Sequence, residues 1–303
     1  MTSTDANGAE TLLAEARERM DARLGAWAER LRAELPGRAG EAAAYALMSP
    51  GKRVRAALVL AAYRSTGGTG PAIDGVAAAV ETVHAYSLVH DDLPCMDDDD
   101  LRRGRPTTHR AFDVPTATRA GFVLVPVAAR VLAGAAQELG LAAAVLGRMA
   151  MELFAAGGVE GMVGGQWLDL EAERRALDLA ELTRVHEGKT GALIRAACAL
   201  GGLAAGAPSA QVEALRRFGG DVGLAFQVAD DVLDVTATSD ELGKTAGKDV
   251  AFDKSTFVQL LGVDGARRYA AELAHRAESH LHEAGVPAAA LAALAGYIAE
   301  RKR

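Results

Sequence analysis

The sequence predicts an all-α fold, a single large domain of many helices that spans residues 1–303. Ala and Leu dominate the composition and only 9 of the 303 residues are proline, which favours helix. Apolar residues recur at spacings of three and four, and no alternation of apolar and polar residues is flanked by hairpin turns. Neither a Ser/Gly/Pro-rich linker nor a repeat of about 20–50 residues divides the chain.

The individual helices follow from these patterns in chain order. An apolar stripe from Leu13 to Leu35 predicts a first helix, which Pro36-Gly37 ends. Residues 54–63 are almost wholly apolar and predict a buried helix, and residues 73–92 predict a long helix that runs into a very acidic segment. Further helices are expected at roughly 116–139, 141–156, 179–203, 209–235, 265–284 and 288–301, and a disordered tail at residues 1–8.

Composition and charge argue against several classes of protein. The net charge is −7, so the surface is poorly suited to the phosphates of a nucleic acid. The 2 cysteines form no CxxC pair, which argues against structural zinc and a disulfide framework. No signal peptide is recognised, and the best membrane candidate, residues 121–136, is short and contains Pro126 and Arg130. We therefore expect a cytoplasmic protein without a stable membrane anchor.

The most informative segment is the acidic run at residues 90–104. Asp91 and Asp92 end an apolar helix, and Pro94 then turns the chain so that Asp97 can return towards Asp91. Two arginines follow directly, so carboxylates and guanidinium groups occur together. Carboxylates hold Mg²⁺, which prefers to share phosphate oxygens, and arginine binds phosphate in a bidentate manner. The segment therefore predicts a site for Mg²⁺ and a diphosphate.

A second acidic cluster lies in the apolar helix around residues 226–234. Asp230 and Asp234 are four residues apart and share one face of that helix. Two unpaired carboxylates on such a face would repel each other and would be costly to desolvate, and a divalent cation removes both problems. Basic residues that could bind phosphate occur near both clusters, at Lys52, Arg53, Arg55, Lys189, Lys244 and Lys254.

The Gly243-Lys244-Thr245 segment resembles the end of a P-loop, but no glycine lies five residues earlier and the preceding segment is a predicted helix. A nucleotide P-loop is therefore rejected.

These motifs resemble those of the trans-isoprenyl diphosphate synthases, the polyprenyl synthetase family, in the bacterial branch close to farnesyl diphosphate synthases. DDLPCMDDDDLRRGRPTTH resembles the first Asp-rich motif of that family and FQVADDVLD the second. GKRVR, GGQWLDLEAE, GKTGALIRAA and LGKTAGKD follow the family's order and spacing, and the resemblance runs from about Leu35 to Arg301. It implies antiparallel helices around a central cavity, usually in a homodimer.

The resemblance also implies roles for individual residues. The expected ligands of three Mg²⁺ ions, for which Mn²⁺ could substitute, are Asp91, Asp92, Asp97, Asp230, Asp231 and Asp234. Isopentenyl diphosphate is expected at Lys52, Arg55, His84 and Arg103. The allylic diphosphate is expected at Arg102, Lys189, Thr190, Gln227, Lys244 and Lys254, and Thr190 would also shield the developing cation. Supporting positions around the cavity are expected at Gln166 and Asp169.

The implied reaction joins isopentenyl diphosphate to dimethylallyl or geranyl diphosphate by ionisation, condensation and proton loss. Tyr86 lies five residues before Asp91 and is expected to form a floor that stops growth at farnesyl diphosphate, with Ser87 leaving room for the growing chain. Geranylgeranyl and geranyl products stay open, because Arg119, Phe122 and Pro126 depart from the family pattern in a helix that borders the product pocket. A terpene cyclase and a non-catalytic partner subunit are the alternatives from other classes.

Overall fold

A computed structural model describes residues 3–172, 175–236 and 255–300 of the chain. It confirms the all-α prediction, since the strands of the described part are limited to one short hairpin. The elements are α1 (Ser3–Glu34), α2 (Arg38–Leu47), α3 (Val54–Ser65), α4 (Ile73–Asp91), β1 (Leu101–Arg102), β2 (Arg105–Pro106), α5 (Thr108–Ala111), α6 (Val114–Glu138), α7 (Ala143–Gly157), α8 (Met162–Glu171), α9 (Leu179–His186), η1 (Glu187–Gly191), α10 (Ala192–Ala204), α11 (Ser209–Thr236), α14 (Phe257–Glu283) and α15 (Ala289–Ala299).

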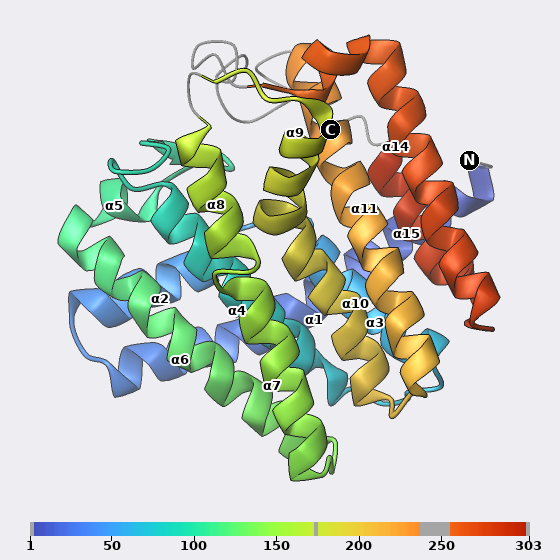
Figure 1. Cartoon of the computed structure of the whole chain (residues 1–303). Coiled ribbons are helices and arrows are strands. Elements are labelled where there is room, and N and C mark those ends of the chain that lie inside the picture. The colour runs from blue at the N-terminus through green and yellow to red at the C-terminus, as the bar shows by residue number, and fades with distance from the viewer. Residues whose placement is uncertain (1–2, 173–174, 237–254, 301–303) are drawn as a thin grey trace.

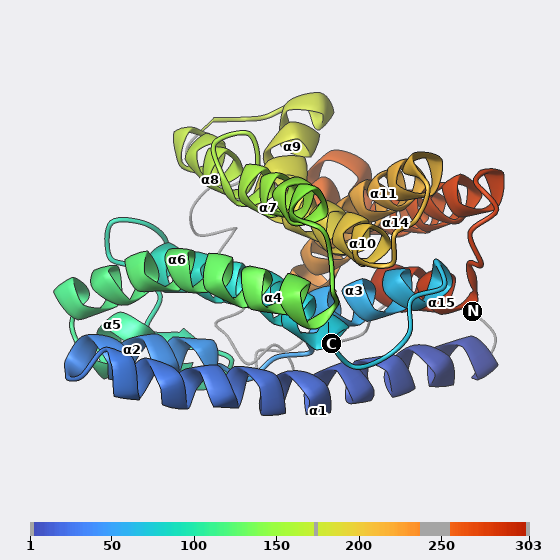
Figure 2. The same cartoon turned by 90° about the horizontal axis from the view of Figure 1, so that it is seen from below.

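The helices pack in layers around a buried centre (Figure 1). Figure 2 shows α1 extended along one side of the molecule, where it packs against α2, α3 and α15. On the opposite side, α7 to α11 and α14 form a second layer, within which α11 packs most extensively against α14 and α10. Helices α3 and α4 lie between these layers and contact both α1 and α10.

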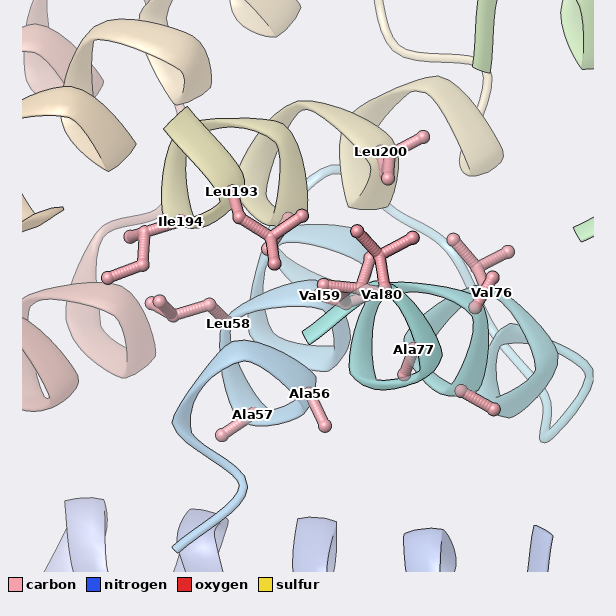
Figure 3. Close-up of a cluster of buried hydrophobic side chains, with 14 of the residues drawn as sticks. Ala56, Ala57, Leu58, Val59, Val76, Ala77, Val80, Leu193, Ile194 and Leu200 are labelled. Atoms are coloured by element: carbon pink, nitrogen blue, oxygen red, sulfur yellow. The ribbon is translucent and has the colours of Figure 1, made fainter. Parts of the chain in front are cut away.

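The core contains mainly small and branched apolar side chains. Leu58, Val80 and Leu193 are fully or almost fully buried and come from α3, α4 and α10 respectively, and Figure 3 shows them meeting at the centre of the bundle. Ala56 and Ala77 are also fully buried, and Figure 3 shows them on the opposite side of α3 and α4 from this cluster, where their small side chains let helices approach closely. The Ala-rich composition therefore serves tight helix packing, as the periodicity predicts.

Side-chain caps fix several helix starts. The Asp113 carboxylate accepts a hydrogen bond from the backbone N–H of Thr116 at 2.7 Å at the start of α6. Capping boxes begin α9, with Asp178 and Glu181, and α14, with Thr256 and Gln259.

The structure differs from the sequence prediction in several elements. Residues from Ser3 onwards belong to α1, although a disordered tail was expected over residues 1–8. The single helix expected at 179–203 is interrupted by the π-helix η1, and α8 was not predicted. Helix α14 begins at Phe257 rather than near 265, and its axis changes at Gly262, which has φ 70°.

Helix α6 lies close to its expected bounds, begins two residues earlier, and contains Pro126 in its interior. Pro126 leaves the carbonyl of residue 122 without its helical donor. Among the described helices, α6 is the one that is long and apolar enough to cross a membrane, with half of its most apolar window buried inside the protein. Its neighbours are mainly α4 and α2, so its apolar face is that of a core helix.

Candidate active site

The first acidic motif folds back on itself at the end of α4, as the position of Pro94 predicts. The N–H of Asp97 donates to the carbonyl of Asp91 at 2.8 Å, and the N–H of Asp99 donates to the carbonyl of Asp92 at 3.3 Å. These bonds hold Asp97 beside Asp91, so the segment is a tight acidic turn and not an extended solvated loop.

Asp91 lies in an environment that disfavours its charged form. Burial raises the pKa of Asp91 to about 7, and the neighbouring Asp97 and Asp92 carboxylates add to this effect, while Lys189 and Arg102 oppose it. A bound divalent cation would remove the penalty, because it neutralises the carboxylates where they lie.

Asp92 has a protein partner of its own. Its Oδ1 accepts from Nε of Arg102 at 2.9 Å, and Arg102 Nη2 also contacts Asp99 Oδ2 at 3.0 Å. Burial raises the pKa of Asp92 although Arg102 lowers it. Asp92 therefore orients Arg102. If Asp92 also binds a metal ion, as the sequence predicts, it must do so while paired with Arg102.

A two-residue turn places the next arginine. Arg103 and Gly104 both have positive φ angles, 54° and 75°, and connect β1 to β2. The turn directs the Arg103 guanidinium back over the start of α3, where Nη1 donates to the carbonyl of Pro50 at 2.5 Å.

His84 on α4 lies between two cationic side chains. Its Nε2 is 3.4 Å from Nη1 of Arg55 and 3.4 Å from Nη2 of Arg103. Burial, with Arg55 and Arg103, lowers the pKa of His84 well below its usual range. A neutral imidazole that accepts at Nε2 is consistent with both contacts, because guanidinium groups can only donate.

Arg55, His84, Arg102 and Arg103 line one cleft of about 750 Å³ between α1, α3, α4, α11 and α15, whose wall does not include Asp91 or Asp97. The cleft brings together side chains from both acidic motifs and from the basic segment before α3. The residues in its wall that the sequence predicted are Lys52, Arg55, His84, Arg102, Arg103 and Asp230.

The second acidic motif splits into different roles along α11. Asp231 is 3% exposed, and its two carboxylate oxygens accept from Gln227 Nε2 at 3.0 Å and from the N–H of Phe257 at 2.7 Å. Gln227 in turn accepts from the hydroxyl of Thr190 at 3.2 Å. Both oxygens of Asp231 are thus engaged by hydrogen bonds within the protein, and Asp230 lies in the wall of the cleft.

The backbone at Lys189, the expected catalytic lysine, lies very close to the backbone of α8. An added Cβ at Gly165 on α8 would lie 2.0 Å from the backbone nitrogen of Lys189, so only glycine fits there. Lys189 Nζ pairs with Asp169 Oδ2 at 2.6 Å. Burial alone would lower the pKa of Lys189, but Asp169, Asp97 and Asp91 outweigh it and the pKa is raised.

Other predicted positions have mixed outcomes. Gln166 is buried and neither of its amide atoms has a hydrogen-bond partner in the described part of the chain. Ser87 donates to the carbonyl of His84 at 2.9 Å. Tyr86 packs edge-on against His90, which packs edge-on against Phe122, with ring centroids 5.1 and 5.5 Å apart.

Lys244 and Lys254 lie outside the described residues. Asp234 is half-buried near the end of α11.

Glu81, a buried acidic residue in the wall of the cleft, was given no role from the sequence. It is 3% exposed and pairs with Arg53, which the sequence identified as basic but gave no role. A single acidic residue inside an otherwise apolar helix was the signal that could have found it.

Magnesium fits the chemistry of this donor set. Within the described residues, no group of three or more His, Cys, Asp or Glu side chains is placed to hold a metal ion by itself. Mg²⁺ usually takes one or two carboxylates and completes its shell with water and substrate phosphates, which matches separate carboxylates at Asp91 and Asp230. The residues that would hold it are Asp91, Asp97 and Asp230.

Comparison with known proteins establishes the family of the chain. The family model described as polyprenyl synthetase matches residues 38–292, and the chain belongs to this family. The chain is 38% identical over 278 residues to farnesyl diphosphate synthase of Bacillus subtilis, covering 92% of this chain and 90% of that protein. It is 45% identical over 263 residues to a chloroplastic geranylgeranyl pyrophosphate synthase of Catharanthus roseus, covering 86% and 73%.

A solved structure extends the likeness to three dimensions. The geranyltransferase of Helicobacter pylori, complexed with magnesium and isoprenyl diphosphate, superposes with a TM-score of 0.79 at 31% identity. The match covers 98% of this chain and 97% of that chain. The predicted family and the isoprenyl synthase fold are therefore confirmed.

Proposed function

We propose that this chain is a magnesium-dependent short-chain trans-prenyltransferase that joins isopentenyl diphosphate to dimethylallyl or geranyl diphosphate. The observation that carries the proposal is the cleft, where Lys52, Arg55 and Arg103 face the carboxylate of Asp230 across a common space. A cluster of cations suits one diphosphate, and carboxylates beside Arg102 suit a second diphosphate that arrives with metal ions.

The cationic cluster is the proposed site of isopentenyl diphosphate. Arg55 is half-buried in the wall of the cleft, and desolvation together with Arg103 lowers its pKa to about 10, which leaves it charged at neutral pH. The neutral His84 accepts from both arginines and so holds their remaining N–H groups towards the cleft. Lys52 completes this subsite from the segment before α3.

The acidic motifs are the proposed site of the allylic diphosphate. Asp91, Asp97 and Asp230 would hold Mg²⁺, three ions per site by the family resemblance, with Mn²⁺ as a substitute. When bound, Mg²⁺ stabilises negative charge on the leaving diphosphate. Arg102 and Lys189 stabilise the same charge from the protein, and both have fixed positions through Asp92 and Asp169.

Gln227 and Thr190 lie beside this site. Their side chains are joined by a hydrogen bond, and the buried Thr190 hydroxyl is available near the developing allylic cation. Lys244 and Lys254 are proposed as further diphosphate ligands from the family resemblance alone. No nucleophilic side chain is required, because the double bond of isopentenyl diphosphate supplies the electrons for the new bond.

We propose farnesyl diphosphate as the main product. Tyr86 is five residues before Asp91, so it lies about 7.5 Å further down α4 from the metal site. The ring is supported by His90 and Phe122, so it forms a firm floor for a growing tail. A geranylgeranyl product is the alternative, and the similarity to the plant enzyme favours testing it.

We also propose that the protein is a cytoplasmic homodimer. Phe122, Met151 and Trp167 are 65%, 73% and 63% exposed and lie on α6, α7 and α8. Large apolar side chains at this exposure are typical of a surface that a second copy covers.

An assay with purified protein tests the proposed function. The protein is incubated with Mg²⁺, isopentenyl diphosphate and geranyl diphosphate, and products are sized by mass spectrometry. We expect farnesyl diphosphate and inorganic diphosphate, and no product in excess EDTA. A cyclic hydrocarbon formed without isopentenyl diphosphate would indicate a terpene cyclase, and no product without an added synthase would indicate a partner subunit.

A further inference from the structure

The turn before α3 contains a residue in an unfavourable backbone conformation. Arg53 has φ 55° and ψ 38°, in the left-handed region that side chains with a Cβ rarely adopt. Its neighbours Lys52 and Arg55 both line the cleft. Such a conformation persists only where surrounding contacts fix it, and it is often found where a site requires a particular geometry.

The contacts that fix it come from a buried ion pair. Arg53 is 7% exposed and Glu81 is 3% exposed. Arg53 Nη1 donates to Glu81 Oε2 at 3.1 Å, and Arg53 Nη2 donates to the carbonyl of Ser49 at 3.0 Å. The guanidinium therefore closes the loop between residues 49 and 53 and ties it to α4.

Glu81 has a second function in the same place. The N-cap residue of α3 is Arg53, whose side chain makes no capping hydrogen bond. Glu81 Oε1 instead accepts from the backbone N–H of Ala56 at 3.2 Å, so a carboxylate of α4 caps α3 from outside (Figure 3 labels Ala56 in the first turn of α3). One carboxylate thus fixes both the start of the helix and the residue before it.

The negative charge of Glu81 also acts on the cationic cluster. Burial lowers the pKa of Arg55 and of Arg103, and Glu81 opposes this lowering in both cases. Without Glu81, the arginines that the proposed function assigns to isopentenyl diphosphate would repel each other more strongly in a desolvated space.

We propose that Glu81 and Arg53 are positioning residues for the isopentenyl diphosphate subsite. They act through Lys52 and Arg55, whose side chains leave the chain on either side of the strained residue. The inference rests on the proposed function, because it states that this pair affects the binding of isopentenyl diphosphate and not that of the allylic diphosphate. The allylic subsite at the end of α4 is built from other contacts, through Asp92 and Asp169.

The test compares steady-state constants for the two substrates in four variants. Glu81→Gln is expected to raise KM for isopentenyl diphosphate by about tenfold or more, since small misplacements of binding groups have large effects. KM for geranyl diphosphate should stay within about twofold. The control is Glu152→Gln, which breaks the pair of Glu152 with Arg216 between α7 and α11, outside the cleft. It should lower thermal stability without changing either KM.

Arg53 variants separate positioning from direct binding. Glycine adopts the left-handed region without strain, whereas alanine does not. If Arg53 acts by holding the turn, Arg53→Gly should retain a lower KM for isopentenyl diphosphate than Arg53→Ala. Equal KM values in these two variants would overturn the inference, as would parallel increases for both substrates in Glu81→Gln. Wild-type protein that forms no product would instead overturn the proposed function itself, and the inference with it.

Discussion

Replacing Asp231 by Asn is expected to destabilise the protein through α14 and not through lost metal. Asp231 accepts from Gln227 Nε2 and from the N–H of Phe257, the first residue of α14. Asn offers one acceptor oxygen, so one of the two donors would face an amide NH₂ group in a buried site. Loss of one hydrogen bond to a charged group costs about 1.5–3 kcal/mol, and we expect a loss of about 2 kcal/mol in the free energy of unfolding.

The assay is urea unfolding in buffer with EDTA, in which metal binding contributes nothing to stability. Asp230→Asn is the matched control, because Asp230 is the adjacent residue but faces the cleft, and its free energy of unfolding should change by about 0.5 kcal/mol or less. Asp231→Asn should leave the Mg²⁺ concentration for half-maximal activity unchanged. Unaltered stability together with a higher Mg²⁺ concentration for half-maximal activity would refute this reasoning and would indicate that Asp231 is a metal ligand.

The remaining predictions concern the metal, the product and pH. Turnover should vanish in excess EDTA, and Asp91→Ala and Asp230→Ala should each lower kcat by about 10²-fold or more. Asp91→Asn should stabilise the metal-free protein above pH 7, because the raised pKa of Asp91 makes its charged form costly in the folded state. Tyr86→Ala should shift products towards twenty carbons and Ser87→Phe towards ten, and a product distribution unmoved by both changes would remove Tyr86 as the floor. The pKa of His84 is lowered in the folded state, so the unfolded chain binds the proton first and stability falls as pH drops below about 6.5. Thermal unfolding of His84→Gln between pH 7 and 5 should show a smaller loss than wild type, and an equal loss would show that His84 is not the group responsible.

The helices were predictable because their causes are local. Spacing and composition indicated the buried character of α3 and the length of α4, which are properties of a single segment. The π-helix η1 was not predictable, because it forms where the backbones of α8 and η1 meet at Gly165. That contact joins residues that are distant in the chain, and no periodicity records it.

The site was predictable as a set of residue types but not as a set of roles. The acidic motifs predicted Asp91 and Asp230 as metal ligands, and Asp230 lies in the cleft together with the basic residues that were also predicted. Adjacent residues on a helix point about 100° apart, so Asp230 and Asp231 could not share the face that Asp230 shares with Asp234. Glu81 escaped notice because its partners, Arg53 and Ala56, lie on another helix.

The central claim is that the chain binds two diphosphates side by side, isopentenyl diphosphate in the cationic cleft and the allylic diphosphate on the acidic motifs. The most direct measurement is a crystal structure with Mg²⁺, isopentenyl diphosphate and an allylic thiolodiphosphate whose C–S bond resists ionisation. The account predicts the isopentenyl diphosphate phosphorus atoms beside Lys52, Arg55 and Arg103, and the thiolodiphosphate with metal between Asp91 and Asp230. An isopentenyl diphosphate bound outside the cleft, or both diphosphates on the acidic motifs, would contradict it.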